Sequence, residues 1–181
     1  EERKPIGGFL FLSQRPMLFV LNLGDEEANQ LDTAVDRHKL GALQGRPNTA
    51  VVAVCGRLEA ELAEMDDKEA VELLASYGLK EPGLNRLIRA TYDLMGLTSF
   101  FTAGDPEVRA WTIHKGTNAV KAAGAIHSDI EKGFIRAEVV RWDDLLAAGS
   151  LGAAREKAQV RLEGKDYPVQ EGDVILFRHS G

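Results

Sequence analysis

Residues 16–25 read PMLFVLNLGD, a continuous apolar run followed by a polar turn. The run shows no alternation of polar and apolar residues, which is typical of a strand buried on both faces in a parallel sheet. A second run, TAVVAV at residues 49–54, is rich in β-branched residues and is followed by Cys55-Gly56-Arg57. The two runs are separated by a segment that favours helix, so together they predict a layered α/β domain.

Helical patterns fill the rest of this first region. We expect helices over residues 26–43, 58–65, 66–78 and 83–95. Asp66 and Glu69 have the spacing of a capping box at a helix start, and Gly96 is a suitable residue to end the last helix. That last helix is amphipathic, and we expect it to bury one apolar face. The expected buried residues are Leu84, Leu87, Ile88, Thr91, Leu94 and Met95.

The pattern changes near residue 98, where short strands replace long helices. Strands are expected at residues 99–102, 109–113, 134–140 and 173–177, with a hairpin at residues 160–169 that turns near Gly164-Lys165. We expect one helix at Ala119–Ile126 with Thr117 as its N-cap, and another around residues 143–148. Short strands with a helix packed across them describe a small α+β domain. We place the boundary between the two regions at about residues 97–98.

The composition is that of an ordinary globular protein, since 44% of the 181 residues are hydrophobic and 28% are charged. The single cysteine, Cys55, excludes an internal disulfide and therefore a secreted disulfide scaffold. No apolar run reaches the roughly 20 residues of a membrane span, and the short stretch Phe9–Leu12 does not resemble a signal peptide. We therefore expect a cytoplasmic protein without a membrane partner. The net charge of −6 gives no sign of nucleic-acid binding, but a local basic face stays open.

The turns that follow the two apolar runs carry the candidate ligand-binding residues. In open α/β sheets, ligands bind at the carboxyl ends of the strands. Asn22 can order neighbouring loops there, and Asp25 can accept a hydrogen bond from the edge of a purine. The small residues Cys55 and Gly56 would let the backbone approach a base. The alternative is that N-x-x-D forms only a turn with an Asx cap.

This order of elements resembles the base-recognition half of a P-loop GTPase-like domain, in which N-K-x-D is followed by S-A-K. Residues 100–117, FFTAGDPEVRAWTIHKGT, look like the start of the TGS domain of the Obg-like ATPase family (YchF type). The resemblance extends to residues 122–124, 127–129, 131–139 and 167–177. It covers nearly the whole chain from Arg15 onward and is densest after Phe100.

The resemblance implies three parts. Residues 1–14 would end a helical insertion, residues 15–97 would form the C-terminal part of a P-loop nucleotide-binding domain, and residues 98–181 would form a TGS domain with a ubiquitin-like β-grasp fold. Members of this family are cytoplasmic, hydrolyse ATP and in some cases GTP with Mg²⁺, and associate with ribosomes. The implied partners are therefore a nucleotide and the ribosome, through its large subunit or its RNA. By position, the base pocket would comprise Asn22, Leu23, Asp25, Cys55, Gly56 and Arg57.

Two departures from the family pattern limit what this chain can do. The sequence has no G-x-x-x-x-G-K-[ST], and no D-x-x-G precedes the first strand, so the phosphate cradle, the Mg²⁺ ligand and the catalytic residues are absent. We therefore expect no nucleotide hydrolysis by this chain alone. Leu23 stands where guanine-specific relatives have Lys, and Asp25 stands where the family usually has Glu. The first change favours ATP, and the second leaves GTP open.

Two functions are compatible with these observations. The chain is either the C-terminal half of a ribosome-associated NTPase or a free-standing, non-catalytic TGS module that binds RNA or a ribosomal partner. A small-molecule-binding protein with a crevice near Asn22 is disfavoured, because about half of such a crevice would be missing.

Basic side chains outside the base pocket offer a contact for ribosomal RNA, although an ordinary solvated face is the alternative. The candidates are Arg86 and Arg89, expected on the outer side of their helix, together with Arg155, Lys157, Arg161 and Lys165. No sequence-specific DNA binding is expected. His127, Asp129 and Glu131 alternate as metal ligands can, but a helix end followed by a turn explains them better, so we expect no metal site.

Overall fold

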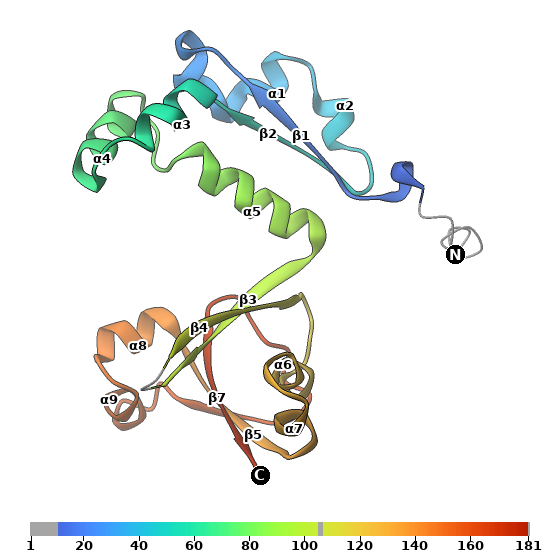
Figure 1. Cartoon of the computed structure of the whole chain (residues 1–181), viewed down its shortest axis with the longest axis vertical. Helices are drawn as coiled ribbons and strands as arrows, with labels where there is room; N and C mark the ends of the chain where they lie inside the picture. Colours follow the sequence, from blue (N-terminus) through green and yellow to red (C-terminus); the bar gives the residue numbers. More distant parts are fainter. Residues whose placement is uncertain (1–10, 105–106, 181) are drawn as a thin grey trace. The chain divides into compact units, whose positions relative to one another are not determined.

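The computed structural model describes residues 11–104 and 107–180, and the chain divides into two compact units, Glu1–Met95 and Gly96–Gly181 (Figure 1). The predicted boundary at residues 97–98 falls at the start of the second unit. Most of the segment expected to end a helical insertion, residues 1–10, lies outside the described residues. Within the described ranges, no helix is both long enough and apolar enough to cross a membrane.

The first unit is built on two parallel strands, β1 (Met17–Asn22) and β2 (Thr49–Val54), as both apolar runs predict. Their register runs from the pair Met17 and Thr49 to the pair Asn22 and Val54. Leu23 N continues the ladder by donating to Val54 O at 2.8 Å. Because the strands are parallel, the turns that follow them lie at the same edge of the sheet.

The connection between β1 and β2 is not the single helix that was predicted for residues 26–43. It consists of a 3₁₀ segment η3 (Asp25–Thr33) and two short helices, α1 (Ala34–Arg37) and α2 (Gly41–Gln44). Gln30 has non-helical φ and ψ of −124° and 20°, and Lys39 has a positive φ of 57°. Leu31 and Ala34 pack in a small core cluster with Leu23 and Ala53, so burial against the strands replaces a regular helical path.

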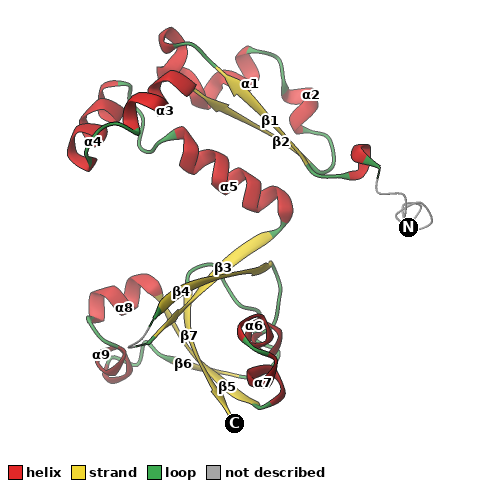
Figure 2. Ribbon diagram, viewed as in Figure 1, coloured by secondary structure: helices red, strands yellow, loops and turns green. Residues whose placement is uncertain are grey.

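Three helices follow β2, and they begin close to the predicted positions. They are α3 (Gly56–Leu62), α4 (Asp67–Ser76) and α5 (Gly83–Met95). The predicted capping box of α4 is confirmed: the Asp66 side chain accepts hydrogen bonds from Lys68 N and Glu69 N, and Asp66 N donates one to the Glu69 carboxylate. Helix α5 packs against both strands (Figure 2).

The prediction that one face of α5 is buried is wrong for three of the six residues it named. Leu84, Ile88 and Met95 are 55%, 49% and 51% exposed, and only Leu87, Thr91 and Leu94 are half-buried. The sheet of this unit has two strands, which is too narrow to cover the whole apolar face of a helix. Val20 on β1 is likewise 48% exposed.

The second unit contains a five-stranded sheet with the order β4-β3-β7-β5-β6. The strands are β3 (Leu97–Ala103), β4 (Val108–His114), β5 (Phe134–Arg141), β6 (Arg161–Glu163) and β7 (Asp173–His179). Strands β3 and β7 are parallel, and the other neighbours are antiparallel. The first and last strands of the sheet, β3 and β7, therefore lie side by side, and β3 also pairs with β4 in a hairpin.

Helices pack on both faces of this sheet. They are α6 (Ala119–Ile126), α7 (Ser128–Lys132), α8 (Trp142–Ala148) and α9 (Leu151–Glu156). Helix α6 packs its alanines against Phe100, Val139 and Ile175, whereas residues of α8 and α9 pack against Val140 and Val174 on the other face. The range predicted for α6 is confirmed, and α9 was not predicted.

The predicted N-cap of α6 is wrong by one residue. Asn118 caps the helix by accepting a hydrogen bond from Lys121 N at 3.1 Å. Thr117 instead donates its hydroxyl to His114 O at 2.7 Å. The cap therefore goes to the side chain that is closer to the first turn of the helix.

The hairpin predicted for residues 160–169 does not form. β6 pairs with β5, and the chain then runs beside the segment that precedes α6, where Val169 N donates to Thr117 O at 3.0 Å. Val169 is buried in the main core, and Tyr167 Oη donates to the buried Asp173 at 2.8 Å. These tertiary contacts outweigh the local preference for a hairpin.

Candidate functional site

The carboxyl ends of β1 and β2 bring the predicted base-pocket residues together. Asn22 is the last residue of β1, opposite Val54 at the end of β2. Asn22 Oδ1 accepts a hydrogen bond from Gly56 N at 2.9 Å, although the two residues are thirty-four positions apart. This bond ties the turn after β1 to the first residue of α3, so the two polar turns form one local structure.

Gly56 lies in close contact with the Asn22 side chain. A Cβ atom at position 56 would lie 3.1 Å from Asn22 Oδ1 and 3.5 Å from Asn22 Nδ2. A larger residue would push the amide away and weaken the link between the two turns. The small residue predicted here therefore has a structural reason in addition to any approach of a base.

Asp25 is held by the turn after β2. Its Oδ2 lies 3.0 Å from Arg57 Nη1, and its Oδ1 accepts a weak hydrogen bond from Cys55 Sγ at 3.5 Å. Arg57 is 74% exposed and also lies 3.6 Å from Glu61. A carboxylate has about four acceptor sites, so Asp25 retains capacity for a donor such as the amino group of a base.

The other two predicted pocket residues point into the protein. Cys55 is completely buried, next to Leu58 and Ala28 in one core cluster. Leu23 is 7% exposed and packs with Leu31 and others in a second cluster. Their side chains support the site from beneath, and the polar groups that face solvent come from Asn22, Asp25 and Arg57.

Glu59 is a structural residue of this site that the sequence analysis missed. Its carboxylate accepts hydrogen bonds from Gly83 N at 2.6 Å and from Leu84 N at 3.0 Å. It therefore caps the first turn of α5 from α3. A Cβ at position 83 would lie 2.8 Å from Glu59 Oε1, which explains why α5 starts with a buried glycine. No pattern within one helix indicates a cap that lies twenty-four residues away.

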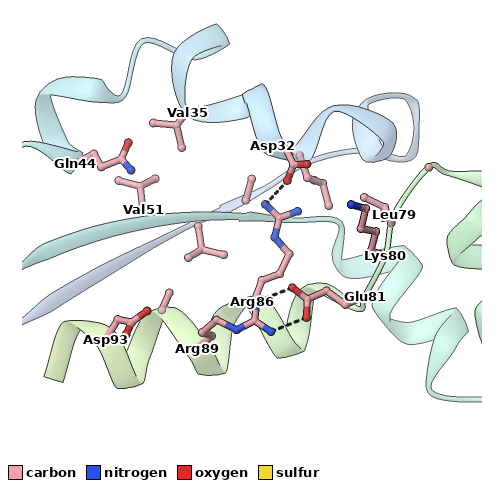
Figure 3. A pocket seen from close by; sticks show the side chains of 15 residues that line it. Asp32, Val35, Gln44, Val51, Leu79, Lys80, Glu81, Arg86, Arg89 and Asp93 are labelled. Carbon is pink, nitrogen blue, oxygen red and sulfur yellow. Dashed lines mark hydrogen bonds and ion pairs between the residues drawn. The ribbon is translucent and has the colours of Figure 1, made fainter. Parts of the chain in front are cut away.

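A pocket of about 490 Å³ lies between α5, η3 and β2, away from the turn residues just described (Figure 3). Arg86 enters it from α5 and lies 2.8 Å from Asp32. Arg89 donates two hydrogen bonds of 2.8 Å to the two oxygens of Glu81. The Arg89 hydrogen bonds lower the pKa of Glu81 and keep it ionised. Each arginine is thus matched by a carboxylate in the lining of the pocket.

The arrangement of Arg86 and Arg89 corrects their predicted position. Both line the pocket instead of the outer side of α5, and both are ion-paired. Arg86 is the more enclosed, with 23% of its side chain exposed. Paired charges of this kind give little net attraction for RNA phosphates.

The remaining RNA candidates lie in the second unit, and two of them are engaged within it. Arg155 donates to Glu138 at 2.5 Å, and Arg161 donates to Tyr167 Oη at 3.0 Å. Lys157 and Lys165 are exposed. The structure therefore assigns internal contacts to both arginines and leaves the two lysines in solvent.

A buried acidic group organises the end of this second unit. Asp173 is completely buried, and its Oδ2 accepts hydrogen bonds from Tyr167 Oη and from Gln170 N at 2.8 and 2.9 Å. Burial and the bond to Asp173 raise the pKa of Tyr167 to about 12. Tyr167 therefore stays protonated and acts as a hydrogen-bond donor. This network fixes the strand β7 to the segment that replaces the predicted hairpin.

The histidine and acidic side chains of the described residues do not gather into a metal-binding cluster. Residues 11–104 and 107–180 contain no group of three or more His, Cys, Asp or Glu placed to hold a metal ion. In residues 127–131, His127 Nδ1 accepts a hydrogen bond from Asp129 N at 3.2 Å, and the Glu131 carboxylate lies 2.6 Å from Lys121 Nζ. These contacts begin and support α7.

Comparison with known families and proteins gives matches along the whole chain. The family YchF-GTPase_C, described as "Protein of unknown function (DUF933)", matches residues 97–180. "Ribosome-binding ATPase YchF" of Bacillus subtilis (strain 168) is 44% identical over 180 residues, which is 99% of this chain and 49% of that protein. The protein of the same name from Haemophilus influenzae is 46% identical over 181 residues. The chain spans about half the length of the curated relatives it matches.

Solved structures agree with these matches. The structure of the Schizosaccharomyces pombe YchF GTPase has a TM-score of 0.78 and 28% identity, and the match covers 98% of this chain and 47% of that one. A GTP-binding protein from Pyrococcus horikoshii OT3 matches with a TM-score of 0.55 at 20% identity, which supports the fold alone.

Proposed function

The chain belongs to the YchF family and corresponds to the C-terminal half of its members, and from this we propose that it is part of a ribosome-associated P-loop NTPase. In that protein, this half would recognise the nucleotide base and bind the ribosome. The observation that carries the proposal is the 42–46% identity, over 98–99% of the chain, to proteins named "Ribosome-binding ATPase YchF". The complete protein would bind and hydrolyse ATP or GTP in the cytoplasm. Mg²⁺ would be held by residues that this chain does not contain.

The first unit would supply the base-binding side of the nucleotide site. Support comes from the single edge at which Asn22, Asp25, Gly56 and Arg57 lie, joined by the bond between Asn22 and Gly56. Asp25 would accept a hydrogen bond from the base while Arg57, which is largely exposed, moves aside or shares the carboxylate. Leu23 replaces the lysine of guanine-specific relatives, so we propose ATP as the preferred nucleotide and GTP as the alternative.

The second unit would be a TGS domain with a β-grasp fold. The strand order β4-β3-β7-β5-β6, with β3 and β7 parallel at the centre, supports this assignment. So does helix α6, which follows the β3–β4 hairpin and packs across the core of the sheet. This domain would bind RNA or a protein of the large ribosomal subunit.

Nucleotide binding by this chain alone would be weak, because phosphate contacts supply most of the affinity in sites of this kind. We expect a dissociation constant for ATP weaker than about 1 mM, and no hydrolysis. Isothermal titration calorimetry and a phosphate-release assay measure the two quantities. A dissociation constant for ATP well below the millimolar range, or release of phosphate, would contradict the proposal that the phosphate-binding and catalytic residues lie outside this chain.

The ribosome-binding part of the proposal is tested by co-sedimentation of the purified chain with ribosomes. We expect pelleting without nucleotide that weakens steeply between about 50 and about 200 mM salt, as phosphate contacts require. Absence of pelleting at the lower salt would refute the proposal. Pelleting that does not depend on salt would indicate a ribosomal protein as the partner.

The native mass separates the NTPase from the free-standing module. A cellular species of about twice the 19.8 kDa of this chain would support the half-protein assignment, as the coverage of relatives leads us to expect. A native species of 19.8 kDa would favour a non-catalytic binding module.

A further inference from the structure

Two arginines lie opposite each other on neighbouring strands at the surface of the second unit. Arg136 on β5 is the direct partner of Arg178 on β7 in the antiparallel register. Side chains of opposite residues project from the same face with Cβ atoms about 4.5–5.5 Å apart, and like charges in that position are destabilising. Both arginines are exposed. The fold therefore places two like charges opposite each other on its surface.

The buried carboxylate of Glu138 compensates part of this positive charge. Glu138 follows Arg136 by two residues, so it lies on the same face of β5. Its Oε1 accepts from Arg178 Nε at 2.8 Å, and its Oε2 accepts from Arg155 Nη2 at 2.5 Å. The hydrogen bonds from Arg178 and then from Arg155 lower the pKa of Glu138, so it stays ionised near neutral pH. One negative charge thus holds two guanidinium groups, those of Arg155 and Arg178, beside Arg136.

Some guanidinium N–H groups of these arginines make no hydrogen bond to Glu138. Arg178 donates through Nε, and within residues 11–104 and 107–180 its Nη groups make no hydrogen bond. Arg136 has no ion-pair partner in the same ranges. The side chains of Arg155 and Arg178 are 45% and 48% exposed. Glu138 therefore holds Arg155 and Arg178 in place while about half of each side chain stays accessible, next to the exposed Arg136.

Apolar side chains lie beside the arginines on the same face. Leu162 on β6 and Leu176 on β7 are both register partners of Glu138. Leu162 is 62% exposed, and Leu176 is half-buried. Residues of α8 and α9 pack on the adjoining part of this face, against Val140 and Val174. The arginines thus border an apolar strip that remains accessible.

We propose that this surface, formed by Arg136, Arg155 and Arg178 around Glu138 and called the arginine face below, binds the phosphate backbone of RNA. The inference rests on the proposed ribosome-binding function and assigns its contact to one face of one domain. A guanidinium group matches phosphate oxygens through two parallel N–H bonds, and an added phosphate would relieve the repulsion between Arg136 and Arg178. Leu162 and Leu176 would contact the sugar or an unstacked base.

Charge elsewhere in the chain is consistent with this location. Most of the excess of acidic residues lies in residues 1–95, although the whole chain carries a net charge of −6. Arg86 and Arg89 of the first unit are each paired with a carboxylate, Asp32 and Glu81 respectively. The arginine face is therefore a local excess of positive charge in an acidic protein.

The test uses the whole 181-residue chain and a fluorescein-labelled RNA hairpin of mixed sequence, about 20 nucleotides long, measured by fluorescence anisotropy. Arg136→Gln should weaken binding roughly three- to tenfold and reduce the slope of log K against log salt by about one. Arg136→Glu should weaken binding further without lowering the melting temperature, because a carboxylate opposite Arg178 replaces a like-charge pair by an attractive one. Loss of binding from an unfolded protein is thereby excluded.

Arg109→Gln is the matched control. Arg109 is an exposed strand arginine of the same unit, and its guanidinium carbon lies 4.2 Å from the ring centre of Trp111, which packs against the core on the other face. The substitution removes the same charge, and we expect it to change RNA affinity by less than about twofold. Equal effects of Arg109→Gln and Arg136→Gln would overturn the proposal, since they would indicate net charge alone.

Other outcomes separate the arginine face from the proposed function. If the wild-type chain and Arg136→Gln bind ribosomes and the RNA hairpin equally well, the arginine face is refuted and ribosome binding stands. If the wild-type chain binds neither, both proposals fail. A polyglutamate peptide tests a different ligand. If it binds the wild-type chain, and Arg136→Gln abolishes that binding but leaves RNA binding intact, the arginine face recognises an acidic protein segment. That result overturns the RNA assignment.

Discussion

The two units of this chain differ in how completely they cover their own apolar residues. The first has a two-stranded sheet, small core clusters, and exposed apolar side chains on β1 and on its longest helix, such as Val20, Leu84 and Ile88. The second has a five-stranded sheet with a large buried core on one face and a second cluster on the other. A domain with its own closed core folds by itself, whereas exposed apolar faces mark surfaces that another part of a protein covers.

The same difference separates the two candidate sites. The proposed base pocket lies in the unit with uncovered apolar faces. The arginine face lies in the unit with the closed core. Under the proposed function, we expect this chain alone to bind ribosomes and not to hydrolyse nucleotide.

Phe100→Ala should have the largest effect on stability. Phe100 is fully buried and makes an edge-to-face contact with Phe177 at 5.9 Å between ring centres. We expect the free energy of unfolding of the second unit to fall by about 3–5 kcal/mol. Urea unfolding followed by tryptophan fluorescence measures it, because both tryptophans, Trp111 and Trp142, belong to this unit. Val108→Ala, at a residue 74% exposed, is the control; equal losses would refute a closed core.

Glu138→Gln should cost about 2–3 kcal/mol near pH 7, because it removes the ionised acceptor of two arginines. The folded-state pKa of Glu138 lies below its ordinary value of 4.5, owing to Arg178 first and then Arg155. The stabilisation is therefore fully present above that ordinary value and is lost as the pH falls through the folded-state pKa.

Urea midpoints of wild type and Glu138→Gln, measured from about pH 7 down to about pH 3, test this expectation. The difference between the two proteins should shrink as the solution becomes more acidic. A difference that stays constant with pH would show that the Glu138 charge contributes nothing to the stability of the second unit. Asp143→Asn, at an exposed acid of the same unit, serves as the control.

Glu59→Ala should destabilise the first unit by about 1–2 kcal/mol, because Gly83 N and Leu84 N lose their acceptor. Hydrogen exchange followed by mass spectrometry reports on this unit separately, and the first turn of α5 should exchange faster. Glu61→Ala is the matched control on the same helix, since Glu61 has only a 3.6 Å contact with the exposed Arg57. Unchanged exchange at residues 83–86 in Glu59→Ala would contradict the assigned cap.

Asn22→Ala should cost about 1 kcal/mol, the typical contribution of one hydrogen bond. The bond from Gly56 N joins the two turns of the base pocket, so faster amide exchange at Gly56 is the expected result. Protection at Gly56 that is the same in wild type and variant would show that the two turns are held together by other contacts. Thr49→Ala, at the opposite end of β2, is a suitable comparison.

Leu84→Ser should have the smallest effect in this chain, within about 0.5 kcal/mol, because the side chain is 55% exposed. If the rest of a nucleotide domain covers this face, the same substitution in the complete protein should cost about 2 kcal/mol. Thermal unfolding of both proteins makes the comparison. A similar small cost in both would mean that the apolar stripe of α5 stays exposed in the complete protein.

The sequence predicts those elements whose signals are local. The apolar runs locate β1 and β2, the spacing of Asp66 and Glu69 gives the capping box of α4, and the range of α6 follows from its own residues. Resemblance along the chain identifies the family. The errors fall where distant parts compete with a local preference, as in the absent hairpin after residue 160.

The sequence by itself therefore determined the two regions, most of their strands and helices, and the turns that carry Asn22, Asp25 and Gly56. Only the tertiary structure decided which side chains meet: Glu59 with the start of α5, Arg86 with Asp32, and Arg136 opposite Arg178. The physical reason is range. Helix and strand periodicity depends on residues a few positions apart, whereas strand register and helix packing bring together residues that are tens of positions apart.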